Sequence, residues 1–159
     1  MSRHHRRPSS VRRPVARLAA EHLEDRVNPV VSFGLIGGAA PQLLPFDTDN
    51  PAAALAPIPV VGINPGETLV GIDVRPQNGI LYALGVNPGA DTGTLYVIAV
   101  RNGQAGPAGG ATAVGAIAGV GDLPDPATGA RYGVDFNPTL DRLRVTTSTG
   151  LNLSVDPNT

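Results

Sequence analysis

The chain has 159 residues, a net charge of −1, 20 glycines, 16 prolines and no tryptophan or cysteine. Its length allows one domain with an aliphatic core, and the lack of cysteine excludes disulfides and thiolate zinc sites. Seven of the twelve basic residues, all arginine, lie in the first 26 residues, and the remainder is acidic. An acidic body does not attract phosphate backbones, so we expect no nucleic-acid partner.

Residues 1–29 form a basic leader that we expect to be disordered or to contain a short helix. Residues 15–26 have apolar side chains at helical spacing, and Pro29 ends that pattern. The apolar stretch 30–46 contains Pro41 and Pro45, so it does not predict a membrane-spanning helix, and we expect no transmembrane segment. An apolar signal-peptide core over 30–40 remains an alternative.

From about residue 31 the sequence repeats. The clearest copies, offset by 62 residues, are GIDVRPQNGILYAL at 71–84 and GVDFNPTLDRLRVT at 133–146. Each copy predicts a strand, a turn that begins at a proline, and a returning strand, which is a β-hairpin. Gly79 in the first copy and Asp141 in the second are expected to help close the turns. In the first copy, alternation predicts Val70, Ile72 and Val74 on one face of the strand.

Further strands extend each hairpin into a four-stranded meander. The predicted third strands are 42–48, 94–100 and 150–156, and the predicted fourth strands are 53–62 and 111–119. A short strand at 32–37 precedes the third strand at 42–48. The first unit then lacks its first strand and the last unit lacks its fourth.

This period of about 50–60 residues is typical of a β-propeller blade. We therefore expect an all-β, propeller-like domain over 30–159 with about two and a half blades, and a chain that is truncated at its C-terminus. A half-ring that needs a second copy, and a β-fold that does not close as a propeller, remain alternatives.

The folded part offers few groups for catalysis, because no His, Cys or Lys occurs after residue 26. Asp91-Thr92-Gly93 has the letters of an aspartic-protease triplet but follows turn residues, so we interpret it as a hairpin turn. Residues 47–50 are interpreted as a turn as well. We therefore assign no catalytic, cofactor-binding or metal-binding residue.

Asp73 and Asp135 occupy the same repeat position inside strands, where aspartate is disfavoured. We expect each of them to accept hydrogen bonds from loop amides. A ring of carboxylates that holds Ca²⁺ is the alternative.

The repeats resemble a bacterial family known as domain of unknown function 4394, on the stretches PGETLVGIDVRPQNGILYALG at 65–85 and YGVDFNPTLDRLRVTTSTGLNLSVDP at 132–157, with FDTDNP at 46–51. The resemblance covers residues 32–159 and implies a propeller-like fold, without implying any catalytic residue. Separately, HLEDRVNP at 22–29 resembles the L-E-x-R-x-x-P leader of some secreted and surface proteins of bacteria.

Together these features predict a non-catalytic structural or binding module, located outside the cell or in the cell envelope, whose ligand is unknown. The alternatives are a carboxylate- or calcium-dependent propeller hydrolase and a non-functional gene fragment. Open sheet edges also predict self-association, because their unpaired N–H and C=O groups recruit other strands.

Overall fold

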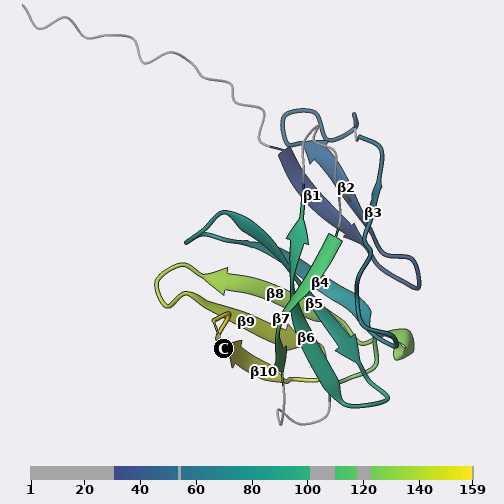
Figure 1. Ribbon diagram of the computed structural model, residues 1–159, viewed down its shortest axis with the longest axis vertical. Coiled ribbons are helices and arrows are strands. Elements are labelled where there is room, and N and C mark those ends of the chain that lie inside the picture. The colour runs from purple at the N-terminus through teal and green to yellow at the C-terminus, as the bar shows by residue number, and fades with distance from the viewer. Residues whose placement is uncertain (1–30, 54, 101–109, 118–122, 159) are drawn as a thin grey trace, which may run out of the picture.

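The computed structural model describes residues 31–53, 55–100, 110–117 and 123–158, which form three antiparallel sheets (Figure 1). The expected helix at 15–26 lies outside the described residues. The strands are β1 (Val31–Ile36), β2 (Gln42–Asp47), β3 (Ile58–Pro59), β4 (Thr68–Arg75), β5 (Ile80–Asn87), β6 (Thr92–Ala99), β7 (Gly110–Ile117), β8 (Tyr132–Asn137), β9 (Arg142–Thr147) and β10 (Asn152–Val155). A 3₁₀ turn, η1 (Pro126–Thr128), precedes β8.

Each sheet is a meander of consecutive strands, in the orders β1-β2-β3, β4-β5-β6-β7 and β8-β9-β10. The all-β prediction is therefore confirmed, as are the grouping of the strands and the units with three, four and three strands. The fourth strand predicted at 53–62 is much shorter than expected, since β3 contains only two residues. Pro57 and Pro59 lack the N–H groups that a longer ladder needs.

The two repeated hairpins close in the same way. Gly79 has a φ of 67° and its N–H donates to the Arg75 carbonyl at 2.8 Å, while Asp141 has a φ of 52° and its N–H donates to the Asn137 carbonyl at 2.9 Å. Glycine reaches positive φ without strain, and aspartate tolerates it better than most residues do. The turn roles predicted for Gly79 and Asp141 are confirmed.

The predicted alternation along β4 is wrong at its start. A β-bulge between Leu69 and Gly71 inserts an extra residue into the ladder with β5. As a result Val70 packs with the second and third sheets, whereas Ile72 packs with the first and second. A bulge re-aims the side chains that follow it, so the apolar residues of β4 serve two cores.

These two apolar cores lie between successive sheets. One lies between the first and second sheets and is formed by Leu43, Val60, Leu69, Leu81, Ala83, Tyr96 and Ile98. The other lies between the second and third sheets and is formed by Tyr82, Leu84, Val86, Leu95, Ile117, Leu123, Phe136, Leu143 and Val145. In the second core the rings of Tyr82 and Phe136 meet edge to face at 5.2 Å. The second sheet is thus buried on both faces, and the three units depend on one another for burial.

Candidate functional site

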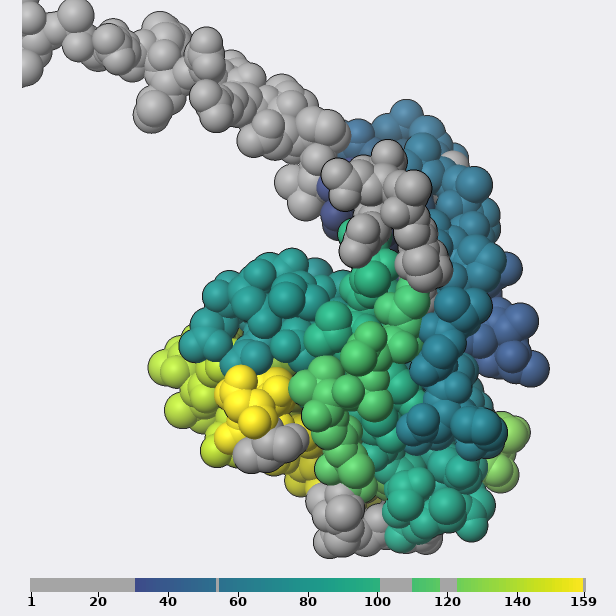
Figure 2. Space-filling model, viewed as in Figure 1, coloured from purple at the N-terminus to yellow at the C-terminus, as the bar shows by residue number. Residues whose placement is uncertain are grey.

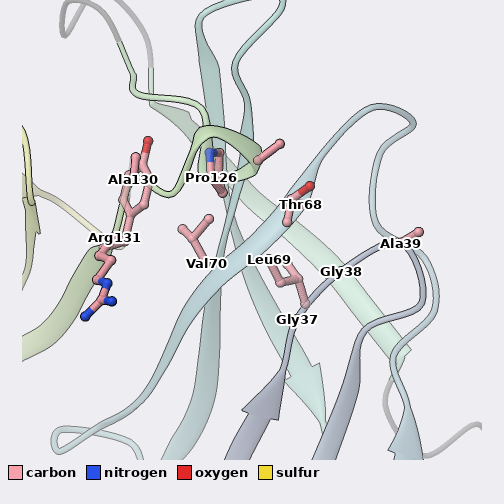
Figure 3. A pocket seen from close by; sticks show the side chains of 11 residues that line it. Gly37, Gly38, Ala39, Thr68, Leu69, Val70, Pro126, Ala130 and Arg131 are labelled. Atoms are coloured by element: carbon pink, nitrogen blue, oxygen red, sulfur yellow. The ribbon is translucent and has the colours of Figure 1, made fainter.

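A cavity of about 690 Å³ opens where all three units meet (Figure 3). Its wall consists of the β1–β2 turn, the start of β4, the η1 turn and the start of β8, and it is formed by residues 37–39, 68–70, 126–127 and 130–132. Figure 3 shows Val70 lying between Pro126 and Arg131, with Arg131 pointing away from Pro126. Glycine, alanine and aliphatic side chains dominate the wall, so it suits a largely apolar ligand, and its volume lies within the range of small-molecule pockets.

Local hydrogen bonds hold this wall in place. Asp125 caps the η1 turn, since its carboxylate accepts from the Ala127 N–H at 2.8 Å. The Tyr132 hydroxyl donates to the Pro124 carbonyl at 2.7 Å and fastens the preceding loop to β8. The Arg131 N–H donates to the Ser148 hydroxyl at 3.1 Å. The cavity is therefore built by turns that hydrogen bonds hold in place.

Asp73 joins two units. Its carboxylate accepts from the Val74 N–H at 2.8 Å and, across to β8 in the next sheet, from the Phe136 N–H at 2.6 Å. The expectation that Asp73 and Asp135 both accept from loop amides is wrong. The partners of Asp73 lie in strands, and Asp135 is exposed and accepts no hydrogen bond from a described residue. The difference arises because the contact runs between neighbouring units, and β8 has no described neighbour on the corresponding side.

A second tie between units centres on Arg75, which is only 5% exposed at the end of β4. Its guanidinium pairs with both carboxylate oxygens of Asp141 in the β8–β9 turn, with Nε donating to Oδ1 at 2.8 Å. It also donates to Tyr82 Oη at 3.3 Å, Gln77 Oε1 at 2.8 Å and Asn158 Oδ1 at 2.9 Å. These bonds satisfy a buried cation, as burial requires.

The pairing shifts the pKa values of both groups. The hydrogen bond with Asp141 raises the pKa of Arg75 above its ordinary value, and the same bond lowers the pKa of Asp141 below its usual value of 3.8. This pair was not predicted from the sequence. A lone arginine at the end of an apolar strand was the available signal, but nothing in the sequence indicated its partner 66 residues away.

A polar network also lies where β4 begins. The Glu67 carboxylate accepts from the Thr94 and Tyr96 hydroxyls, each at 2.6 Å, and the Asn64 N–H donates to Tyr96 Oη at 2.8 Å. Gly85 makes room for it, because a Cβ there would lie 2.5 Å from Glu67 Oε2. Burial, with a smaller contribution from the Glu67 bond, raises the pKa of Tyr96 above 10.0. The network pins the 64–67 turn onto β6, and it was not predicted from the sequence either.

The turn interpretation is confirmed for residues 47–50 and for Asp91, whereas Thr92 and Gly93 begin β6. Asp91 lies in the β5–β6 turn with a φ of 52°, and its carboxylate accepts from the Leu123 N–H at 2.6 Å. The Asp47 carboxylate accepts from the Asp49 N–H at 2.9 Å, which is an Asx turn. Within the described ranges, no three His, Cys, Asp or Glu residues come together in a way that could hold a metal ion. Over the same ranges, no helix is long and apolar enough to cross a membrane.

Comparison with known proteins identifies the chain at the level of a family. Neither the curated proteins nor the solved structures contain a match to it. The model of one family, described as "Domain of unknown function (DUF4394)", matches residues 42–159, which is most of the chain and includes the greater part of the first sheet and all of the other two. The chain therefore belongs to the DUF4394 family.

Proposed function

We propose that this protein is a propeller-like, non-catalytic binding module that works outside the bacterial cell or in its envelope, and that the 690 Å³ cavity is its ligand site. One observation carries the proposal. The charged groups with the strongest contacts, Arg75, Asp141, Asp73 and Glu67, are occupied in joining strands and units, whereas the described wall of the cavity is mostly apolar. Such a wall binds a ligand and offers no carboxylate or imidazole for proton transfer.

The propeller-like arrangement is supported by the contact between β4 and β8. Each is the first strand of its meander, and the two lie side by side in neighbouring sheets, joined by Asp73. First strands that are neighbours around a common axis are what a propeller requires. A location outside the cytoplasm is supported by the HLEDRVNP segment at 22–29, and it can be tested by fractionating cells that produce the full chain or a chain without residues 1–29.

The binding proposal can be tested with anilinonaphthalene sulfonate, a dye whose fluorescence rises in apolar surroundings. We expect saturable fluorescence with the full chain. The Ala127→Trp variant, which fills the cavity from the η1 turn, should lose most of the signal. The Ala53→Trp variant is the matched control, because Ala53 is exposed in the β2–β3 connection and does not line the cavity.

Equal fluorescence from the two tryptophan variants would show that the dye binds elsewhere, and the cavity would lose its role. Melting in the presence of Ca²⁺ tests the hydrolase alternative, since a calcium site would raise the midpoint by mass action. A calcium-dependent rise that disappears in Asp73→Asn would overturn the non-catalytic proposal.

A further inference from the structure

A second hollow lies between the first and second sheets, and its lining contains residues of β1 but none of β2. It consists of two overlapping cavities of about 450 and 510 Å³ that share Val31 and Phe33 of β1, Val74 of β4, Gly79 of the β4–β5 turn and Leu81 of β5. Figure 2 shows the molecule hollowed between the end that carries β1 and the teal hairpin of β4 and β5. We call this hollow the β1–β4 groove. It is separate from the 690 Å³ cavity, and the two share no lining residue.

The groove is lined by β1, a strand with one edge that no described strand covers. In the second sheet β5 is paired on both sides, with β4 and with β6, and in the first sheet β1 stands in the place of β5 but pairs only with β2. The pairing registers of the two sheets correspond. Leu81 pairs with Ile98 in the second sheet, and Ser32 pairs with Phe46, which takes the place of Ile98, in the first. An uncovered edge presents N–H and C=O groups that accept another strand.

The contact between β4 and β8 shows what kind of strand would fit. Gly71 lies so close to β8 that a Cβ on it would be 2.4 Å from Val134 Cγ2, and two residues later Asp73 accepts from the Phe136 N–H. A Gly–aliphatic–Asp strand therefore packs its glycine and its carboxylate against the next first strand. With the repeat offset of 62 residues, Val74 of β4 corresponds to Phe136.

At Val74 no described residue of another unit makes the corresponding contact. Its N–H donates to Asp73 on its own strand at 2.8 Å, whereas the corresponding Phe136 N–H donates to the carboxylate of the preceding unit. The Val74 side chain is 44% exposed, and Val31 and Ile80 on the same groove are each 40% exposed. A docked strand would bury this apolar surface, which favours binding.

We propose that the β1–β4 groove binds an extended polypeptide segment of the Gly–aliphatic–Asp type, which pairs with β1 and places its carboxylate near the Val74 N–H. In the register of β4 with β5, the Asp of the segment lies opposite Phe33, because Asp73 lies opposite Tyr82 and Phe33 corresponds to Tyr82. The next residue then lies opposite Ser32. The occupant is defined by this pattern and goes beyond the small ligand proposed for the larger cavity.

The test uses a labelled synthetic peptide with the sequence of residues 130–138, ARYGVDFNP, and fluorescence anisotropy with the full chain. We expect saturable binding. The peptide with Ala in place of Asp135 should bind about tenfold more weakly or worse, since it lacks the charged acceptor. In the protein, Val74→Lys should weaken binding by about tenfold or more because it places a charge in the apolar groove.

Leu140→Lys is the control in the protein, because Leu140 is an exposed apolar residue outside the groove and its replacement should leave affinity unchanged. The peptide variant keeps the test valid if Val74→Lys does not fold. No saturable binding, or binding that neither Val74→Lys nor the altered peptide weakens, would overturn the proposal. If the peptide binds only after residues 1–30 are removed, the occupant of the groove is the chain's own N-terminal segment and not an external segment. If sedimentation shows a dimer that Val74→Lys dissociates, the occupant of the groove is a second copy of the chain.

Discussion

Replacement of Asp73 by alanine tests whether the contact between β4 and β8 holds two units together. The substitution removes the acceptor of the Phe136 N–H, a 2.6 Å bond in a partly buried position, as well as that of the Val74 N–H. A hydrogen bond to a charged group contributes about 1.5–3 kcal/mol, and water can partly replace it at a half-buried site. We therefore expect a loss of about 1–2 kcal/mol in the free energy of unfolding, and about 0.5–1 kcal/mol for Asp73→Asn, which keeps an acceptor oxygen.

Asp135→Ala is the internal control, because Asp135 has the same position in the repeat but is exposed on β8. Its free energy of unfolding should stay within about 0.5 kcal/mol of the original chain, as for most surface substitutions. Urea unfolding followed by far-UV circular dichroism measures the free energy of unfolding of all three variants. The slope of this free energy against urea concentration should stay unchanged, which shows that the folded and unfolded states remain comparable. Equal losses for Asp73→Ala and Asp135→Ala would refute the reasoning, because the contact between units would then be irrelevant.

Three further predictions concern other contacts. Asp141→Asn keeps the turn but loses the ion pair with Arg75. The original chain should lose stability as the pH falls below about 3.8, because the pKa of Asp141 is lowered on folding. The variant should show a shallower loss of stability in acid melting curves. Tyr96→Phe should cost about 1–3 kcal/mol in urea unfolding. In the original chain the raised pKa of Tyr96 means that stability present below pH 10.0 is lost at higher pH, and absorbance at alkaline pH should show a late ionisation that the variant lacks. Gly71→Ala should lower the free energy of unfolding by about 1–3 kcal/mol through its clash with Val134, and Val134→Ala should relieve part of that cost in a double-mutant cycle. If the costs of the two substitutions simply add, the clash is excluded.

The repeat predicted the hairpins because a hairpin is local. Pro76, Gly79 and Asp141 lie within a few residues of the turns they close, and the backbone angles that they favour are properties of the residues themselves. Contacts between sheets were not predictable in this way. Asp73 and Phe136 are 63 residues apart, and nothing in either strand indicates which amide the carboxylate meets.

The cavity is an extreme case of the same limit. Its wall combines 37–39, 68–70 and 130–132, and each of these segments is an unremarkable turn or strand start in the sequence. Only the packing of the three sheets against one another brings them together. The carboxylates were conspicuous in the sequence and were interpreted correctly as turn residues at Asp91, whereas apolar wall residues carry no comparable chemical signal.

The repeat also shows which roles survive duplication and which do not. The turn residues Gly79 and Asp141 differ in type, yet both have positive φ and donate to the carbonyl four residues earlier, because that role depends on the hairpin alone. The strand glycines are identical, yet a Cβ on Gly71 would meet Val134 of the next sheet, and a Cβ on Gly133 would meet Thr146 of its own sheet at 2.8 Å. A strand position thus takes its role from whatever lies beside it. It follows that a repeated residue in such a β-array indicates the same backbone in each unit, and that its energetic role has to be measured unit by unit.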